Sequence, residues 1–223
     1  MRLLALSALL MAACANDPCG RPPPASALPT DHVLLRPDAP ELNVSPPDSF
    51  DTVLETSAGT VRARIFMDWA PLGAARFYNL ARHGFYDGSR FYRVLPGFAA
   101  QFGMSGIPAV DSVWLRQQLP DEPARVPTGP GTLSYAMAGP GTRTTQVFFS
   151  YRANEMLDAQ GFVPIGRVVE GMDVLLRLNA SYGEIPPQGT GPSFGCMTSH
   201  GNHYLSRRFP RLDSIQAAHV VEL

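Results

Sequence analysis

The stretch Phe85–Gly103 reads FYDGSRFYRVLPGFAAQFG and contains two short runs separated by proline and glycine. We interpret the runs Arg90–Leu95 and Ala99–Gly103 as strands, because Pro96-Gly97 between them marks a turn. Short strands bounded by turn residues are typical of an all-β domain. The stretch therefore favours a β fold, and the pattern on either side of it extends that prediction.

The same pattern of short runs and turns continues outward in both directions. Val61, Ala63 and Ile65 alternate with arginines after Ser57-Ala58-Gly59, which predicts a half-buried strand that follows a hairpin turn. The other strand candidates are Thr52–Thr56, Thr60–Phe66, Thr132–Met137, Gln146–Tyr151, Val163–Val168 and Ile215–Val221. We expect the last of these strands to pair with the first.

Two helices are expected among these strands. Pro71 opens a helical stretch and Gly84 closes it, in agreement with the preference for proline inside a helix start and glycine past its end. A second, short helix is predicted near Glu170–Leu178. Many short strands with only two helices favour a closed antiparallel barrel, which leaves no exposed strand edge. The predicted fold is therefore mainly β.

The composition excludes several classes of protein. The 223 residues include 22 prolines and 20 glycines, which favours turns and short strands over a coiled coil or a helical bundle. The 18 basic residues, all arginine, and the 19 acidic residues give a net charge of −1. Because no surplus of positive charge can neutralise a phosphate backbone, we do not expect nucleic acid as a partner.

The N-terminus has the composition of an export signal. Met1-Arg2 supplies a positive charge, and an apolar run with small residues at its end leads to Cys14. The run is shorter than the ~20 apolar residues that span a bilayer. A small-residue stretch that ends on cysteine resembles the lipobox of bacterial lipoproteins, so we expect a signal peptide over residues 1–13 and lipidation at Cys14. The alternative is an ordinary signal peptide with a chance cysteine after the cleavage site.

A proline-rich segment separates this signal from the predicted domain. Residues 15–48 contain nine of the 22 prolines, and such segments favour extended, semi-rigid backbone. We therefore expect residues 14–48 to be a lipid-anchored, Pro-rich tether and residues 49–223 to be the folded domain. The lipid anchor predicts that the chain sits on a membrane of the bacterial cell envelope and faces the periplasm or the surface.

Three blocks within the predicted domain carry a more specific pattern. The first is Phe85–Gly103, with its Phe-x-Arg-Val-x-Pro-Gly-Phe-x-x-Gln run. The others are Gly129–Pro140 (GPGTLSYAMAGP), which continues to Thr145–Phe149 (TQVFF), and Leu157-Asp158 followed by Phe162–Met172 (FVPIGRVVEGM). Together they resemble the cyclophilin family of peptidyl-prolyl cis–trans isomerases over residues 49–223. The resemblance implies a closed eight-stranded antiparallel β-barrel capped by two helices, with an active groove on its outer face.

The resemblance also implies roles for individual residues. Arg93 takes the place of the family's catalytic arginine, and Gln101 that of its glutamine. The implied substrate-binding positions are the proline cup of Phe98, Phe148 and Leu157 with Ala99, the backbone at Ala136 and Met137, and the groove edge at Met156 and Phe162. Met156, Phe162 and Met137 stand where the family often has Trp, His and Asn. The missing Trp predicts weak binding of cyclosporin.

The chemistry that the resemblance implies needs a hydrogen-bond donor beside an apolar pocket. Amide resonance sets a barrier of ~18–20 kcal/mol to rotation about an Xaa–Pro bond. The twisted bond returns a lone pair to the prolyl nitrogen, so a donor fixed there stabilises only the transition state. Arginine stays protonated and presents several donors in a rigid fork. Because no covalent bond is broken, we expect neither a cofactor nor a metal.

These residues predict a monomeric peptidyl-prolyl isomerase that acts on proline-containing polypeptides, either exported or resident in the envelope. The alternative is a binding or chaperone module that holds proline-rich segments on the same barrel without turnover. A third interpretation is a lipocalin-like carrier, in which the interior of the barrel should be open rather than filled by side chains.

The C-terminal stretch Gly191–Ile215 resembles an extension found in some bacterial cyclophilins, and we expect it to cover one end of the barrel. Cys196 in this stretch can form a disulfide with Cys19 in an oxidising compartment, but the sequence does not show whether the two are close. His200 and His203 lie near Cys196. No second cluster supplies further ligands, so no metal site is expected.

Overall fold

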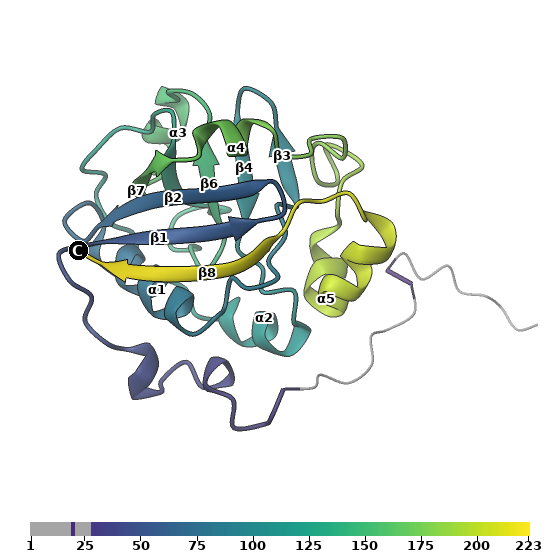
Figure 1. Ribbon diagram of the computed structural model, residues 1–223, viewed down its shortest axis with the longest axis horizontal. Coiled ribbons are helices and arrows are strands. Elements are labelled where there is room, and N and C mark those ends of the chain that lie inside the picture. The colour runs from purple at the N-terminus through teal and green to yellow at the C-terminus, as the bar shows by residue number, and fades with distance from the viewer. Residues whose placement is uncertain (1–18, 21–27) are drawn as a thin grey trace, which may run out of the picture.

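This computed structural model describes residues 19, 20 and 28–223. Within these residues, eight short strands form a single sheet (Figure 1). They are β1 (Ser49–Thr56), β2 (Gly59–Phe66), β3 (Arg93–Leu95), β4 (Ala99–Phe102), β5 (Thr132–Tyr135), β6 (Val147–Ser150), β7 (Pro164–Glu170) and β8 (Ile215–Glu222). All neighbours are antiparallel, in the order β3-β4-β6-β5-β7-β2-β1-β8. The predicted mainly β fold is confirmed.

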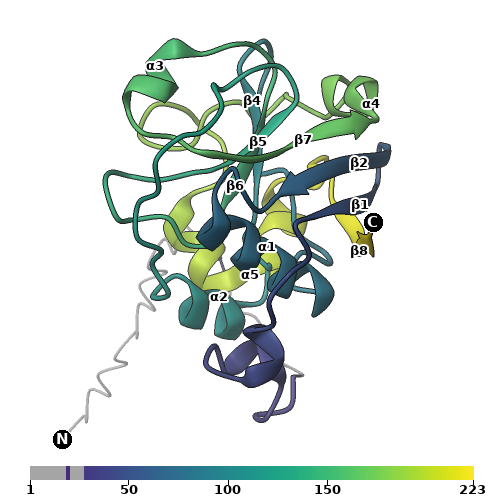
Figure 2. The same ribbon diagram turned by 90° about the vertical axis from the view of Figure 1, so that its left-hand side faces the viewer.

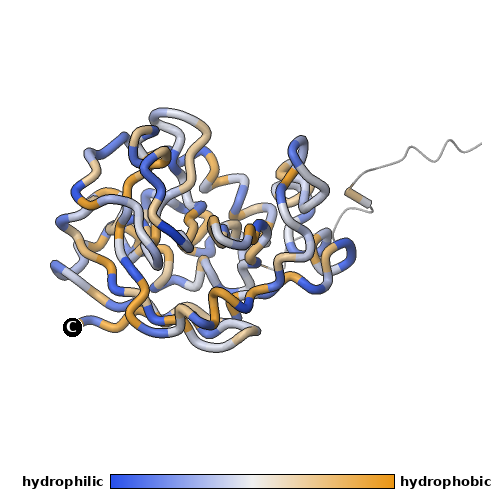
Figure 3. The backbone as a smooth tube through the Cα atoms, turned by 90° about the horizontal axis from the view of Figure 1, so that it is seen from above, coloured by the Kyte–Doolittle hydropathy of each residue, from blue (hydrophilic) through white to orange (hydrophobic). Residues whose placement is uncertain are grey.

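The β1–β2 hairpin shows how the alternating sequence specifies one buried face. Val61, Ala63 and Ile65 of β2 are fully buried, while the residues between them are partly exposed. Strand β8 pairs with β1, which confirms the predicted return of the last strand to the first. Viewed from above, hydrophobic and hydrophilic residues follow one another at short intervals along the chain, as short strands with one buried face require (Figure 3).

The sheet curls strongly but stays open, so the expectation of a closed barrel is wrong in this respect (Figure 2). β3 and β8 are the two edge strands of the sheet. The residues just before them are linked by an isolated bridge between Arg90 and Ser214. The Phe91 N–H also donates to the Asp213 carbonyl at 2.9 Å. Because Pro96 follows β3 directly and lacks an N–H, β3 is only three residues long and pairs with β4 alone.

The concave side of the sheet is filled by side chains, which we call the main core. Its aromatic rings stack in pairs: the ring centroids are 4.8 Å apart for Phe77 and Tyr86 and 5.7 Å apart for Phe102 and Phe149. All four side chains are fully buried. A carrier would need an open interior here, so the lipocalin-like interpretation is wrong.

The two predicted helices are present, but the described residues contain others as well. The helices are α1 (Pro71–Arg82), α2 (Pro108–Trp114), α3 (Glu155–Ala159), α4 (Met172–Leu176) and α5 (Phe194–Arg208). α1 and α4 lie where they are predicted, and the expectation of only two helices is wrong. The N-terminus of α1 has no capping side chain of its own. Instead, the Glu122 carboxylate accepts from the N–H groups of Leu72 and Gly73, at 2.7 and 3.1 Å.

Helix α5 belongs to a separate group of buried residues beside the sheet. This second cluster consists of Tyr92, Met104, Cys196, Met197, Tyr204, Leu205, Phe209 and Leu212. Glycines make the helix hard to recognise in the sequence. At Gly201 the backbone leaves the helical conformation, with a φ of 52°, so that α5 is kinked there, and a Cβ would lie 2.1 Å from the Gly106 carbonyl oxygen. The helix therefore forms because tertiary packing overrides weak local propensity.

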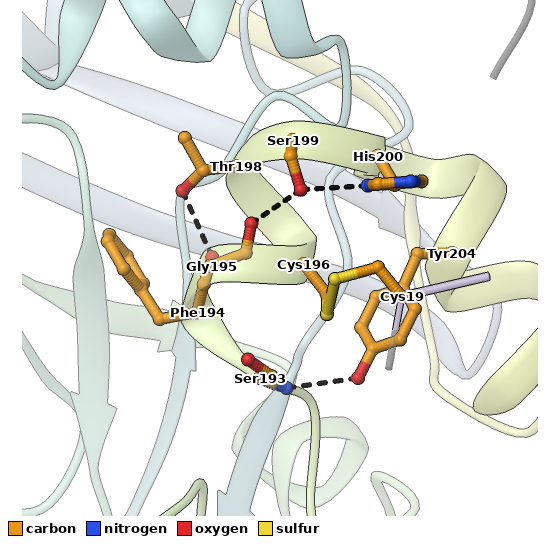
Figure 4. Close-up of a disulfide and its surroundings, with 9 residues drawn as sticks. All are labelled: Cys19, Ser193, Phe194, Gly195, Cys196, Thr198, Ser199, His200 and Tyr204. Atoms are coloured by element: carbon orange, nitrogen blue, oxygen red, sulfur yellow. Dashed lines mark hydrogen bonds between the residues drawn. A yellow bond between two sulfur atoms is a disulfide. The ribbon is translucent and has the colours of Figure 1, made fainter. Parts of the chain in front are cut away.

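A disulfide joins Cys19 to Cys196 at the start of α5, and the Tyr204 ring lies beside it (Figure 4). The Tyr204 hydroxyl also accepts a hydrogen bond of 3.1 Å from the Ser193 N–H, just ahead of the helix. The pairing that the sequence left open is thus present in the structure. It ties a residue of the proline-rich segment to the second cluster.

The described end of the proline-rich segment packs on the domain instead of extending as a tether. Short 3₁₀ turns at Val33–Leu35 and Pro40–Leu42 bury Leu34 and Leu42 in the main core. The Trp114 indole N–H donates to the Leu34 carbonyl at 2.8 Å. The apolar residues between the prolines therefore pack on the domain, although the sequence shows no periodicity there. The predicted signal peptide and Cys14 lie outside the described residues.

Candidate active site

The pairing of three strands lines up the predicted site residues on one face of the sheet. Arg93 of β3 is directly opposite Gln101 of β4, and Gln101 is opposite Phe148 of β6. Directly opposed residues in an antiparallel sheet project to the same face. The strand register alone therefore places an arginine, an amide and an aromatic ring in one row.

An apolar cup lies beside this row on the convex side of the sheet. Ala99, Phe148 and Leu157 form a small buried cluster that is separate from the main core, and Phe98 and Phe162 pack against it. The rings of Phe148 and Phe162 meet edge to face with centroids 5.7 Å apart. The cup opens into a pocket of about 350 Å³, within the usual size range for small-molecule sites.

Three groups hold the Arg93 guanidinium at the rim of this cup. Its Nη1 donates to the Gln101 Oε1 at 3.2 Å, and its Nε and Nη2 donate to the two carboxylate oxygens of Glu184 at 2.6 Å each. The guanidinium carbon lies 5.5 Å from the centre of the Phe98 ring, a cation–π distance. The hydrogen bonds from the Arg93 guanidinium lower the pKa of the Glu184 carboxyl, so this carboxyl is ionised at neutral pH.

Gln101 is in turn held by a buried tyrosine. Its Nε2 donates to the Tyr92 hydroxyl at 2.9 Å, and that hydroxyl donates to the Gln146 Oε1 at 2.5 Å. Burial raises the pKa of Tyr92 far above its ordinary value, so the hydroxyl stays a donor. Tyr92 also belongs to the second cluster, which links the site to α5 through packed side chains.

Glu184 is not among the predicted site residues. It lies 91 positions from Arg93 in a loop between α4 and α5, and its neighbours Ile185 and Gln188 form part of the same pocket wall. Neither spacing nor charge pattern distinguishes this carboxylate from the other acidic residues. Nothing in the residue types around Glu184 demanded a site residue at this point.

The structure gathers most of the predicted site residues around one pocket. Its lining includes Arg93, Phe98, Gln101, Ala136, Met137, Phe148, Leu157 and Phe162. Ala99 is buried in the cluster beneath them. Met156 does not line the pocket: its side chain on α3 is 61% exposed, because the turn of helix that buries Leu157 points the preceding residue outward. The Ala136 N–H is already donated to the Gln146 carbonyl, so only its carbonyl remains for a substrate.

Neither a metal centre nor a membrane span is found in the part of the chain that the structure describes. Residues 19, 20 and 28–223 contain no group of three or more His, Cys, Asp or Glu side chains suited to a metal ion. Cys196 is bonded to Cys19, so its sulfur is not a free thiolate that could bind a metal together with His200 and His203. Within the same residues, no helix has the length and hydropathy that crossing a bilayer requires.

The geometry is that of a curled antiparallel sheet with an arginine at the rim of an apolar pocket. A sequence model of the family described as cyclophilin type peptidyl-prolyl cis-trans isomerase/CLD matches residues 52–189, more than half of the chain. The chain therefore belongs to the cyclophilin family of peptidyl-prolyl isomerases.

Individual relatives and one solved structure agree with this assignment. The chain is 34% identical over 131 residues to peptidyl-prolyl cis-trans isomerase-like 1 of Rhizopus delemar, which covers 57% of this chain and 79% of that protein. Its human namesake is 33% identical over 139 residues, 60% of this chain and 83% of that protein. A crystal structure of a cyclophilin type isomerase from Cryptosporidium parvum shares the fold, with a TM-score of 0.58 at 20% identity over 78% of this chain and 99% of that one. These relatives are eukaryotic and do not support the predicted bacterial lipoprotein.

Proposed function

We propose that the chain accelerates rotation about Xaa–Pro bonds, and that Arg93 does so by donating a hydrogen bond to the prolyl nitrogen of the twisted bond. The observation that carries the proposal is the Arg93 guanidinium held at the rim of the cup formed by Phe98, Phe148 and Leu157. The cup suits a proline ring, because it is apolar and open on one side.

The hydrogen bonds of Arg93 leave donors for this task. A guanidinium has five N–H groups, and three of them are used by Gln101 and Glu184. The two that remain are one on each terminal nitrogen. A donor that is fixed in advance stabilises the developing lone pair without reorganisation, and the apolar surroundings strengthen its field.

The surroundings of the cup supply room for the rest of a peptide. A second pocket of about 400 Å³ adjoins the first and shares Gln101, Ala136, Met137 and Ile185 with it. An extended substrate can therefore place its proline in the cup and a neighbouring residue in the second pocket. The carbonyl of Ala136 and the backbone of Met137 lie between them as candidate partners for the substrate backbone.

The proposed substrates are proline-containing segments of exported or envelope proteins, reached by a monomer anchored through an acylated Cys14. The Cys19–Cys196 disulfide supports an oxidising compartment, since disulfides are rare where thiols are kept reduced. Mass spectrometry of the mature N-terminus tests the anchor. We expect acyl chains on Cys14, and an unmodified or uncleaved N-terminus would contradict it.

The experiment that tests turnover is exchange NMR on a short Xaa–Pro peptide with catalytic amounts of the full chain. We expect cis–trans exchange, which takes tens to hundreds of seconds without a catalyst, to become much faster. Binding of the peptide without faster exchange would instead favour the binding or chaperone module, which the departures at Met137, Met156 and Phe162 motivate. A matched peptide with alanine in place of proline controls for changes unrelated to the prolyl bond.

A further inference from the structure

We propose that Glu184 is a positioning residue that fixes the Arg93 guanidinium for catalysis. This inference rests on the proposed isomerase function. It assigns a role in the same site to a carboxylate that does not belong to the row of Arg93, Gln101 and Phe148 on the sheet. The structural basis is the two-point contact between the Glu184 carboxylate and one edge of the guanidinium, with N···O distances of 2.6 Å.

The contact restricts a side chain that is otherwise flexible. A free arginine samples many rotamers, whereas a planar fork bound by a carboxylate at two points has one orientation. Gln101 holds Nη1 on another side, and Phe98 lies against the guanidinium. Arg93 and Glu184 side chains are 20% and 26% exposed, so water competes only partly for the pair.

The loop that presents Glu184 has a fixed conformation. The Gly191 N–H donates to the Glu184 carbonyl at 2.9 Å, and the Ile185 N–H donates to the Glu184 carboxylate at 2.8 Å. A Cβ at Gly189 would lie 2.2 Å from the Glu184 carbonyl oxygen, so the backbone closes tightly at this point. At the start of the loop, the Tyr182 ring packs edge to face on Phe209 of the second cluster, with centroids 5.0 Å apart.

The pocket is complete with Glu184 in place. Glu184, Ile185 and Gln188 line it together with the residues of the cup. Because two N–H groups of Arg93 are still unused, a substrate can bind while the ion pair persists. The carboxylate therefore acts through Arg93, as a support that sets its direction, and does not need to touch the substrate.

The test compares the steady-state kinetics of the wild type with Glu184→Ala and Glu184→Gln on a Xaa–Pro peptide. A misplaced catalytic group can cost up to about 10²-fold in rate, so we expect Glu184→Ala to lower kcat/KM about 10- to 100-fold. We expect Glu184→Gln to lower kcat/KM less than Glu184→Ala does, because the amide keeps one acceptor for the guanidinium. Some loss should remain, since the amide NH₂ faces the second N–H of Arg93. The loss should fall on kcat with KM within about twofold, since the contact acts in the transition state.

A second readout reports on the guanidinium itself. In the wild type we expect a slowly exchanging Arg93 Nε–H resonance in ¹⁵N NMR, assigned by its absence in Arg93→Ala. It should broaden or vanish in Glu184→Ala while backbone resonances of the sheet stay in place. Asp173→Asn is the matched control, because it removes a carboxylate from an exposed arginine pair with Arg177 outside the pocket. It should leave kcat/KM unchanged.

Three outcomes would overturn the inference. A rise in kcat/KM in either Glu184 variant would mean that Glu184 competes with substrate for Arg93. Unchanged kinetics, or an unchanged Nε–H resonance in Glu184→Ala, would mean that Gln101 and Phe98 suffice to hold the guanidinium. If instead the wild type shows no turnover, the proposed function itself is wrong. That outcome differs from the three above, in which the wild type is active and only the role of Glu184 is wrong.

Discussion

The main core and the second cluster are held together in different ways. The main core lies under eight paired strands and gains its stability from burial of large aromatic side chains. The second cluster is much smaller, packs around α5, and is fastened by the Cys19–Cys196 disulfide. Small hydrophobic clusters gain most from such cross-links. The molecule therefore has one region stabilised by a large buried apolar area and another that a covalent bond also stabilises.

The candidate site lies where these two regions meet. Arg93, Gln101 and Phe148 come from the sheet, whereas Glu184 and Ile185 come from the loop that packs against the second cluster. Changes in the main core should therefore affect the stability of the whole domain. Changes in the second cluster should affect one wall of the pocket first.

The largest expected effect is on the main core. Phe102→Ala removes a fully buried ring that contacts Tyr86, Phe91 and Phe149. We expect a loss of about 3–5 kcal/mol in the free energy of unfolding, because the cavity cannot collapse completely. Urea unfolding followed by circular dichroism measures it. A loss below about 1 kcal/mol would show that the rings do not pack as described.

A smaller and more local effect is expected from the disulfide. Replacing both Cys19 and Cys196 by serine removes a cross-link between residues 177 positions apart, which we expect to cost about 2–4 kcal/mol. Hydrogen exchange should rise in α5 and in the Glu184 loop before it rises in β1 and β2. Equal protection of α5 in the variant and the wild type would contradict the separate character of the second cluster.

The sequence predicted the sheet and the site far better than the C-terminal region. The run from Phe91 to Gln101 specifies a strand, a turn and a strand, so the register that brings Arg93 beside Gln101 follows from local rules. Helix α5 and Glu184 could not be predicted in this way, because their positions depend on packing against residues far away in the chain. Barrel closure was mispredicted for the same reason, since it depends on how edge strands meet in space.

The smallest of these effects concerns an ion pair at the edge of the main core. Hydrogen bonds from Arg64, and then from Arg62, lower the pKa of the buried Asp51 carboxyl below 3.8 despite its desolvation. A carboxyl with a lowered folded pKa contributes stability above its unfolded pKa and loses it as the pH falls through the folded value. Asp51→Asn should therefore cost about 1.5 kcal/mol at pH 7.

Urea unfolding at a series of pH values checks this expectation. The difference between the wild type and Asp51→Asn should begin to shrink below about pH 4, where the carboxyl of the unfolded chain takes up a proton. It should disappear once the pH is below the lowered pKa of Asp51 in the folded state. A difference that stays constant down to pH 2 would show that the charge of Asp51 contributes nothing. The partly exposed Arg62 and Arg64 side chains make the effect sensitive to salt, so the ionic strength must be held fixed.

The most direct test of the central claim compares the wild type with Arg93→Ala in one peptide exchange experiment that reports both binding and rate. We predict that kcat/KM falls about 10²–10³-fold, as when other transition-state donors are removed, while the peptide still binds in the cup. Equal exchange rates for the two proteins, at equal peptide occupancy, would contradict the claim that the Arg93 guanidinium drives rotation of the prolyl bond.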